Sequence, residues 1–161
     1  YGMFAGVYHW FPKMYGKMMN KKLGYLHFWV TFISAYGVFF PMHFLGLAGL
    51  PRRYYNNDAF AMFDNLTGIN EVITFFAITG GLIQLIFVFN FFYSIFKGSK
   101  SVQNPWKSNT LEWTAPIERI HGNWPGDIPE VHRWPYDYSK PGADEDFIPQ
   151  TEPLKEGEIE H

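Results

Sequence analysis

Two long stretches without a charged side chain constrain this chain more than any other feature of its sequence. Residues 24–50 and 72–96 contain no Asp, Glu, Lys or Arg. A helix needs roughly 20 apolar residues to cross about 30 Å of hydrocarbon, at a rise of about 1.5 Å per residue. Each stretch is longer than this, so the sequence predicts two membrane-spanning helices.

The segments around these spans complete the prediction of an all-α membrane protein. Residues 1–12 are as apolar as the spans, but they are too few to cross a bilayer and they end at a proline. We interpret them as the end of a further transmembrane helix that begins before Tyr1, so we expect the chain to be part of a longer protein. Residues 13–23 are predicted to form a cytoplasmic loop, 51–71 a periplasmic loop and 97–161 an extended cytoplasmic tail rich in Pro and Trp.

The lysines predict how the spans are oriented. They cluster before the first span and directly after the second, at Lys13, Lys17, Lys21, Lys22, Lys97, Lys100 and Lys107. Short loops rich in Lys and Arg stay in the cytoplasm because they resist translocation. We therefore expect both clusters and the C-terminus on the cytoplasmic side, and the connection between the spans on the outer side.

Small and polar residues within the spans indicate helices that pack on other helices. The small residues are Ser34, Ala35, Gly37, Gly80 and Gly81. Such residues let helix backbones approach closely in a membrane. Gln84 and Asn90 are predicted to be satisfied by interhelical hydrogen bonds. The spans are also unusually aromatic, which favours a packed bundle over isolated helices in lipid.

The histidines do not form a metal site by their spacing. His27 and His43 are sixteen residues apart on one predicted helix. They therefore lie about 24 Å apart along its axis and about 160° apart around it. We interpret each of them, and His9, as a packing or interface residue, and His121 and His132 as structural residues of the tail. Cysteine is absent, which excludes thiolate ligands and disulfides.

Arg52 and Arg53 stand at the outer end of the first span, where the positive-inside rule predicts few basic residues. The planar, permanently charged guanidinium suits carboxylates and phosphates. The spacing leaves two explanations open. The pair can hold an anionic group inside the protein, or it can reach to lipid headgroups.

The tail repeats a pattern in which proline stands beside an aromatic residue. The pattern occurs at residues 104–106, 124–126 and 134–136. These segments cannot form a continuous helix, and they are too aromatic for ordinary disorder. We expect extended chain held against a larger assembly by Trp106, Trp113, Trp124 and Trp134. The acidic end, residues 152–161, is expected to be solvated.

Two motifs flank most of the first span: residues 7–12 (VYHWFP) and residues 39–54 (FFPMHFLGLAGLPRRY). These motifs and the span between them resemble subunit I of the cytochrome c oxidases, in the haem-copper oxidase family. In the tail, residues 104–106 (NPW), 110–113 (TLEW) and 135–138 (PYDY) resemble bacterial members of the family. The resemblance covers nearly the whole chain, and only the acidic end has no counterpart.

The resemblance implies that this chain is the C-terminal part of the catalytic subunit, with the last two helices of a twelve-helix bundle. In that family an arginine pair binds haem propionates, and this role carries over to Arg52 and Arg53. Phe39 and Met42 would line the haem pocket, although the family often has a polar residue where Met42 stands. The subunit would hold two haems, of the a type, and copper. Their ligands would precede this chain, which would contain no catalytic or metal-ligating residue.

The family also implies partners and a location. The partners would be the rest of subunit I, subunits II and III, cytochrome c and membrane lipid, with no nucleic acid. The chain would lie in the bacterial inner membrane and pump protons while electrons reduce oxygen to water. The alternative is a noncatalytic two-span accessory subunit or assembly factor of a respiratory complex. A transporter would require a broken or charged span, which the sequence does not predict.

Overall fold

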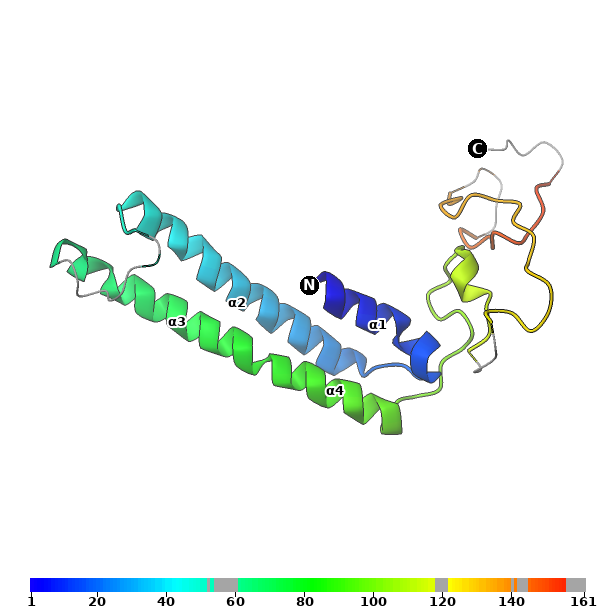
Figure 1. Cartoon of the computed structure of the whole chain (residues 1–161), viewed down its shortest axis with the longest axis horizontal. Helices are drawn as coiled ribbons and strands as arrows, with labels where there is room; N and C mark the ends of the chain where they lie inside the picture. The colour runs from blue at the N-terminus through cyan, green and yellow to red at the C-terminus, as the bar shows by residue number, and fades with distance from the viewer. Residues whose placement is uncertain (52, 54–60, 118–121, 140, 142–144, 156–161) are drawn as a thin grey trace. The chain divides into compact units, whose positions relative to one another are not determined.

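The computed structural model of this chain is mostly helical (Figure 1). It describes residues 1–51, 53, 61–117, 122–139, 141 and 145–155. The chain forms two compact units. Unit 1 contains residues 1–19 and 97–161, and unit 2 contains residues 20–96. Unit 2 is therefore an insertion in unit 1, and the two are described separately.

Unit 1 begins with helix α1, Gly2–Tyr15. The helix ends at Gly16, which has a φ of 65° and donates its backbone N–H to Pro12 O at 2.8 Å. Glycine is favoured there because a left-handed backbone brings no Cβ clash. The next residue, Lys17, pairs with Lys100 in an isolated antiparallel bridge. The first segment of unit 1 is thus joined to the start of the tail.

In its described residues, the tail of unit 1 has little regular structure apart from the short 3-10 helix η3, Leu111–Trp113. Several of its buried side chains are polar. Arg133 donates to the backbone oxygens of Glu152 and Pro153, both at 2.8 Å, and lies 3.4 Å from Asp137. Asn109 is fully buried and donates to the backbone oxygens of Asp137 and Asp146. These bonds connect parts of the tail that are distant in the sequence.

Unit 2 is a pair of antiparallel helical arms that lie side by side (Figure 1). One arm is helix α2, Lys21–Leu47. The other consists of the 3-10 helix η2, Ala61–Leu66, followed by α3, Thr67–Leu82, and α4, Gln84–Lys97. Within the described residues, Lys21–Leu47 and Ala61–Lys97 are the two helical stretches long and apolar enough to cross a membrane.

Both arms start earlier than the uncharged stretches that predict them. Helix α2 begins at Lys21 because Asn20 caps it, accepting hydrogen bonds from the backbone N–H groups of Lys22 and Leu23 at 3.0 and 3.2 Å. An Asn cap satisfies donors that the first turn leaves without partners. Hydropathy alone does not detect such a cap, because capping residues and the first turn are polar.

The second arm is interrupted at Ile83, although one continuous helix was expected. The side-chain Nε2 of Gln84 donates to Gly80 O at 2.7 Å, which gives this carbonyl a side-chain partner. Side chains that bind the backbone compete with helical hydrogen bonds. The adjacent Gly80 and Gly81 also have low helix propensity, so the arm bends or breaks most easily here.

The two arms pack closely through small residues, as predicted. A Cβ on Gly37 would lie 2.6 Å from Cδ1 of Phe76, and one on Gly80 would lie 3.1 Å from Cβ of Ser34. Neither position has room for a larger side chain without movement. At the opposite end of the two arms, the start of the first arm is hydrogen-bonded to the second arm through Asn90. The backbone N–H of Asn20 donates to Asn90 Oδ1 at 3.1 Å, and Asn90 Nδ2 donates back to Asn20 O at 3.1 Å.

Candidate functional site

The end of helix α2 determines where the arginine pair emerges. Gly49 has a φ of 86° and its N–H donates to Gly46 O at 3.1 Å. The next N–H, that of Leu50, donates to Leu45 O at 3.0 Å. These two bonds around a left-handed glycine form a Schellman motif, which ends a helix and turns the chain away. Pro51 follows, so the helix cannot continue into the arginines.

Arg53 is exposed and has a φ of 60°. The planar fork of a guanidinium suits an anion such as a carboxylate. The negative end of the α2 dipole lies just before it in the chain, which favours a cation at this position. Arg52 lies outside the described residues.

Phe39 and Met42 lie on one face of α2, since they are three residues apart. Their exposed fractions are 66% and 49%. Gly46 continues this face one turn further on, and a Cβ there would meet nothing within 4 Å. The face is therefore apolar, uncovered by the residues that the structure describes, and flat near the helix end. It differs from the face that packs on α3 through Ser34 and Gly37.

These residues fit a flat apolar group that carries carboxylates. The side chains of Phe39 and Met42 would contact its apolar part, and Gly46 would leave room for it. The exposed guanidinium of Arg53 would contact its carboxylates beyond the helix end. The structure thus brings three of the four predicted site residues to the same end of one helix.

Of the two histidines in the spans, His27 makes a packing contact between the arms, as predicted, whereas His43 is exposed. His27 is buried, and its Nε2 lies 2.9 Å from Gln84 Oε1. His43 Nδ1 lies 2.9 Å from Phe39 O, within its own helix. In the tail, His132 lies 3.6 Å from Glu130, whereas His121 is outside the described residues. Among the described residues no three His, Asp or Glu side chains gather as a metal site would require.

His9 belongs to an aromatic cluster in unit 1 that the sequence did not predict. Its ring stacks on Trp106 with centroids 5.7 Å apart and meets the ring of Trp113 edge-on at 5.2 Å. Trp106 Nε1 donates to His9 O at 2.9 Å. Three of the predicted anchors therefore act within unit 1, because Trp124 Nε1 also donates to Thr114 Oγ1 at 3.2 Å. The isolated tryptophans in the sequence indicated which residues act as anchors, but not which residues they contact.

Lys13 completes this cluster from the last turn of α1. Its Nζ donates to Ala115 O and lies 5.6 Å from the centre of the Trp113 ring. Burial lowers the pKa of Lys13, and the nearby carboxylate of Glu112 partly opposes this shift. The lysine therefore joins α1 to the tail by a charged hydrogen bond and a cation–π contact.

Two apolar helical arms that are long enough to cross a membrane and pack closely are typical of a segment of a multi-pass membrane protein. The family model described as "Cytochrome C and Quinol oxidase polypeptide I" matches residues 1–79. The chain belongs to this family of oxidase subunits. The second arm is interrupted at Ile83, and a broken span is a feature expected of a transporter. Membership of the oxidase family nevertheless excludes the transporter alternative.

Named relatives extend the match beyond residue 79. The chain is 49% identical over 158 residues to the alternative cytochrome c oxidase subunit 1 of Bradyrhizobium diazoefficiens, covering 97% of this chain and 27% of the relative. It is 39% identical over 156 residues to the cytochrome c oxidase subunit 1 of a Synechocystis species, covering 96% of this chain and 26% of the relative. The chain therefore spans about a quarter of the length of these relatives.

The first match corrects one expectation about the tail. Only 3% of the chain lies outside it, which is fewer residues than the acidic end 152–161 contains. At least part of that end therefore has a counterpart in the relative.

Proposed function

We propose that this chain forms the C-terminal part of the catalytic subunit of a haem-copper oxidase, in which electrons from cytochrome c reduce oxygen to water while protons are pumped. The observation that carries the proposal is the Schellman end of α2, which the exposed Arg53 follows in the chain, together with the exposed Phe39 and Met42 of the same helix. The names of the relatives support the same activity.

The proposed role of this segment is to wall one side of a haem pocket and to hold the haem propionates. Two carboxylates beside an apolar ring system are costly to ionise unless cations lie close to them. Arg53, together with Arg52, supplies permanent positive charge in a shape that matches a carboxylate. The haem, when bound, supplies the electron transfer. The chain's own residues orient it and stabilise the charge on its propionates.

The surroundings follow from the same proposal. The two arms would be the last helices of a twelve-helix bundle in the bacterial inner membrane, with the tail in the cytoplasm. The rest of subunit I would hold the ligands of two a-type haems and of copper. Subunits II and III and cytochrome c would be the protein partners.

The proposal predicts that Arg53→Lys in the intact enzyme changes the haem midpoint potential and the proton release despite keeping the charge. Lysine cannot form the bidentate pair, and one charge-assisted hydrogen bond contributes about 1.5–3 kcal/mol. A redox titration and a pumping measurement on reconstituted vesicles check this. Asp64→Asn is the matched control, because it changes one exposed charge in η2, at the start of the second arm. Wild-type potential and pumping in Arg53→Lys would contradict the role.

A further inference from the structure

Three side chains with polar tips follow one another along helix α2. They are Trp29, Tyr36 and His43, which we call the Tyr36 face. Because they are seven residues apart, they lie on nearly the same side of the helix at intervals of about 10.5 Å. Trp29 and Tyr36 are 55% and 60% exposed, and His43 is also exposed. Within the described residues, this face is therefore uncovered.

The Tyr36 face lies on the side of α2 opposite to the second arm. His27 and Ser34 contact that arm. Tyr36 is nine residues from His27, and His43 is nine residues from Ser34. Nine residues make about two and a half helical turns, so the members of each pair are on opposite sides of the helix. The second arm therefore does not reach the polar tips of the Tyr36 face.

Each member of the face has a polar atom without a hydrogen bond in the part of the chain that the structure describes. Trp29 Nε1 is a donor, and the hydroxyl of Tyr36 can donate or accept. His43 Nδ1 lies 2.9 Å from Phe39 O, which can only accept, so Nδ1 carries the hydrogen. In the neutral ring, Nε2 of His43 is then an acceptor. The face thus offers two donors and one acceptor to a neighbour.

The depth of Tyr36 keeps its hydroxyl away from water on both sides. Tyr36 is 15 residues after Lys21 and 11 before Leu47, which is about 22 and 16 Å along α2. A hydroxyl in hydrocarbon without a partner is costly, and lipid tails offer none. A histidine within a span also faces protein or a water-filled cavity in almost every case. The polar tips of Tyr36 and His43 therefore favour a protein neighbour over lipid.

We propose that the Tyr36 face docks another transmembrane helix of the longer subunit. This helix presents hydrogen-bond acceptors two turns apart, opposite Trp29 and Tyr36, and a donor opposite His43. Such interhelical bonds hold helices together in a membrane. The chain covers only 27% of its relative from Bradyrhizobium diazoefficiens, so most of a subunit of that length lies outside this chain.

The inference rests on the proposed function, because it requires α2 to span the membrane in an oxidase. It adds a contact face that is separate from the proposed haem face. Phe39 is about 60° around the helix from Tyr36, and Met42 is about 100° from His43.

Photo-crosslinking in the intact oxidase tests what the face contacts. p-Benzoylphenylalanine replaces Tyr36 in the full-length protein, and the products formed in the native membrane are identified by mass spectrometry. We expect a cross-link to a peptide from another transmembrane helix of the same subunit. Cross-links to lipid alone, to the haem, or between two copies of the subunit would overturn the proposal.

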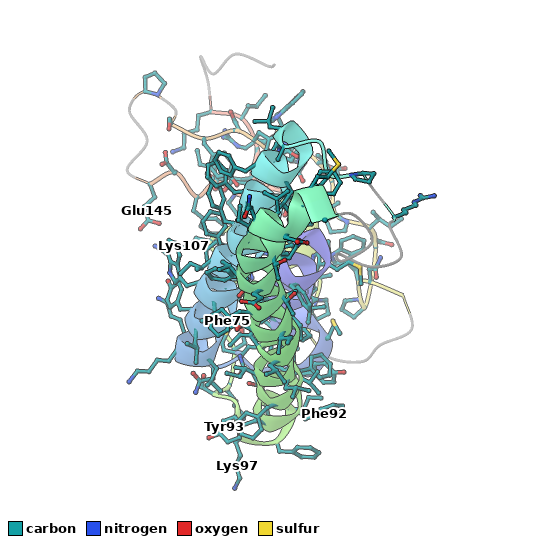
Figure 2. All side chains as sticks on the ribbon, turned by 90° about the vertical axis from the view of Figure 1, so that its left-hand side faces the viewer. Phe75, Phe92, Tyr93, Lys97, Lys107 and Glu145 are labelled. Atoms are coloured by element: carbon teal, nitrogen blue, oxygen red, sulfur yellow. The ribbon has the colours of Figure 1, made fainter. Side chains whose placement is uncertain are left out.

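Tyr36→Phe removes only the hydroxyl, and Tyr93→Phe is its matched control. Each tyrosine stacks on a phenylalanine four residues away in its own helix, Tyr36 on Phe40 at 5.2 Å and Tyr93 on Phe89 at 5.7 Å. Tyr93 is four residues before Lys97, and Figure 2 shows both side chains directed outward at the same end of α4. Tyrosine beside lysine at a helix end is typical of the membrane–water interface, where water satisfies the hydroxyl.

We expect Tyr36→Phe to lower the Tm of the purified enzyme by a few degrees and Tyr93→Phe to leave it unchanged. Equal Tm values in the two variants would overturn the proposal. The reduced haem spectrum, recorded on the same samples, is expected to stay at the wild-type position. A shifted spectrum in Tyr36→Phe would show that the haem covers this face, which would also overturn the proposal.

The outcomes separate this inference from the proposed function. A lipid cross-link at position 36 with a normal haem spectrum would remove the docking face and leave the oxidase function standing. Conversely, the absence of haem from the purified protein would contradict the oxidase function whatever position 36 contacts. If Tyr36→Phe does not assemble, the cross-linking result decides by itself.

Discussion

Gln84 shows how much one polar side chain can organise within an apolar helix pair. Its Oε1 accepts from His27 Nε2 at 2.9 Å, and its Nε2 donates to Thr31 Oγ1 at 3.3 Å as well as to Gly80 O. Because an amide oxygen can only accept, His27 carries its hydrogen on Nε2 in this contact. The sequence predicted an interhelical partner for Gln84, and this is confirmed. It did not identify His27, because residues far apart in sequence have no fixed register before the arms are paired.

We predict that Gln84→Leu lowers the stability of the helix pair by about 1–3 kcal/mol, because the buried His27 Nε2 loses its acceptor. Thermal unfolding in detergent measures the loss. Combining it with His27→Leu removes both members of the pair and is expected to recover most of the stability. If the double variant is as unstable as the sum of the two single variants, this contact does not stabilise the pair.

At the scale of whole elements, the arms can approach because glycine stands where a side chain of the other arm passes. Gly37 faces the ring of Phe76, whereas a Cβ on Gly81 would meet nothing within 4 Å. The sequence predicted both arms from their lack of charge and predicted close approach from their small residues. It could not predict that Gly37 contacts the other arm and Gly81 does not, because the contact depends on the rotation of each arm about its axis.

We predict opposite outcomes for alanine at these two glycines. Gly37→Ala is expected to destabilise by about 1–3 kcal/mol, because the new methyl group overlaps the Phe76 ring. Gly81→Ala is expected to be neutral or to stabilise by up to about 1 kcal/mol through helix propensity. Chemical or thermal unfolding distinguishes them.

A second variant tests the cause of the first effect. Adding Phe76→Leu to Gly37→Ala is expected to restore part of the lost stability, because the smaller side chain yields space. Equal stability of the Gly37→Ala and Gly81→Ala variants would show that the arms are not held as closely as the structure indicates.

At the scale of the whole molecule, unit 1 combines two segments that are far apart in the sequence, and its tail segment contains a buried ion pair. The side chains of Arg133 and Asp137 are 0% and 5% exposed. The sequence predicted an irregular tail with tryptophan anchors, and it gave no sign of this ion pair. Isolated charges in a proline-rich segment look solvated, because their burial depends on turns that local sequence does not determine.

We predict that Arg133→Met loosens the tail, since Asp137 would remain buried without its cationic neighbour. The cost of breaking a buried ion pair is about 3–5 kcal/mol. Limited proteolysis of the intact protein measures it as faster cleavage within residues 97–161. Lys107→Met is the control, because it breaks an exposed pair that contributes at most about 1 kcal/mol. Equal cleavage rates in the two variants would contradict the prediction.

The inserted position of unit 2 also sets an order of events on the ribosome. The last turn of α1 emerges early, yet the strand that pairs with Gly16 and Met18 emerges only after residue 99 has been made. The helical hairpin between them is synthesised before the tail, which then pairs with the residues that precede the hairpin. A polypeptide that stops within α4 therefore lacks residues 99–101, with which residues 16–18 of unit 1 pair.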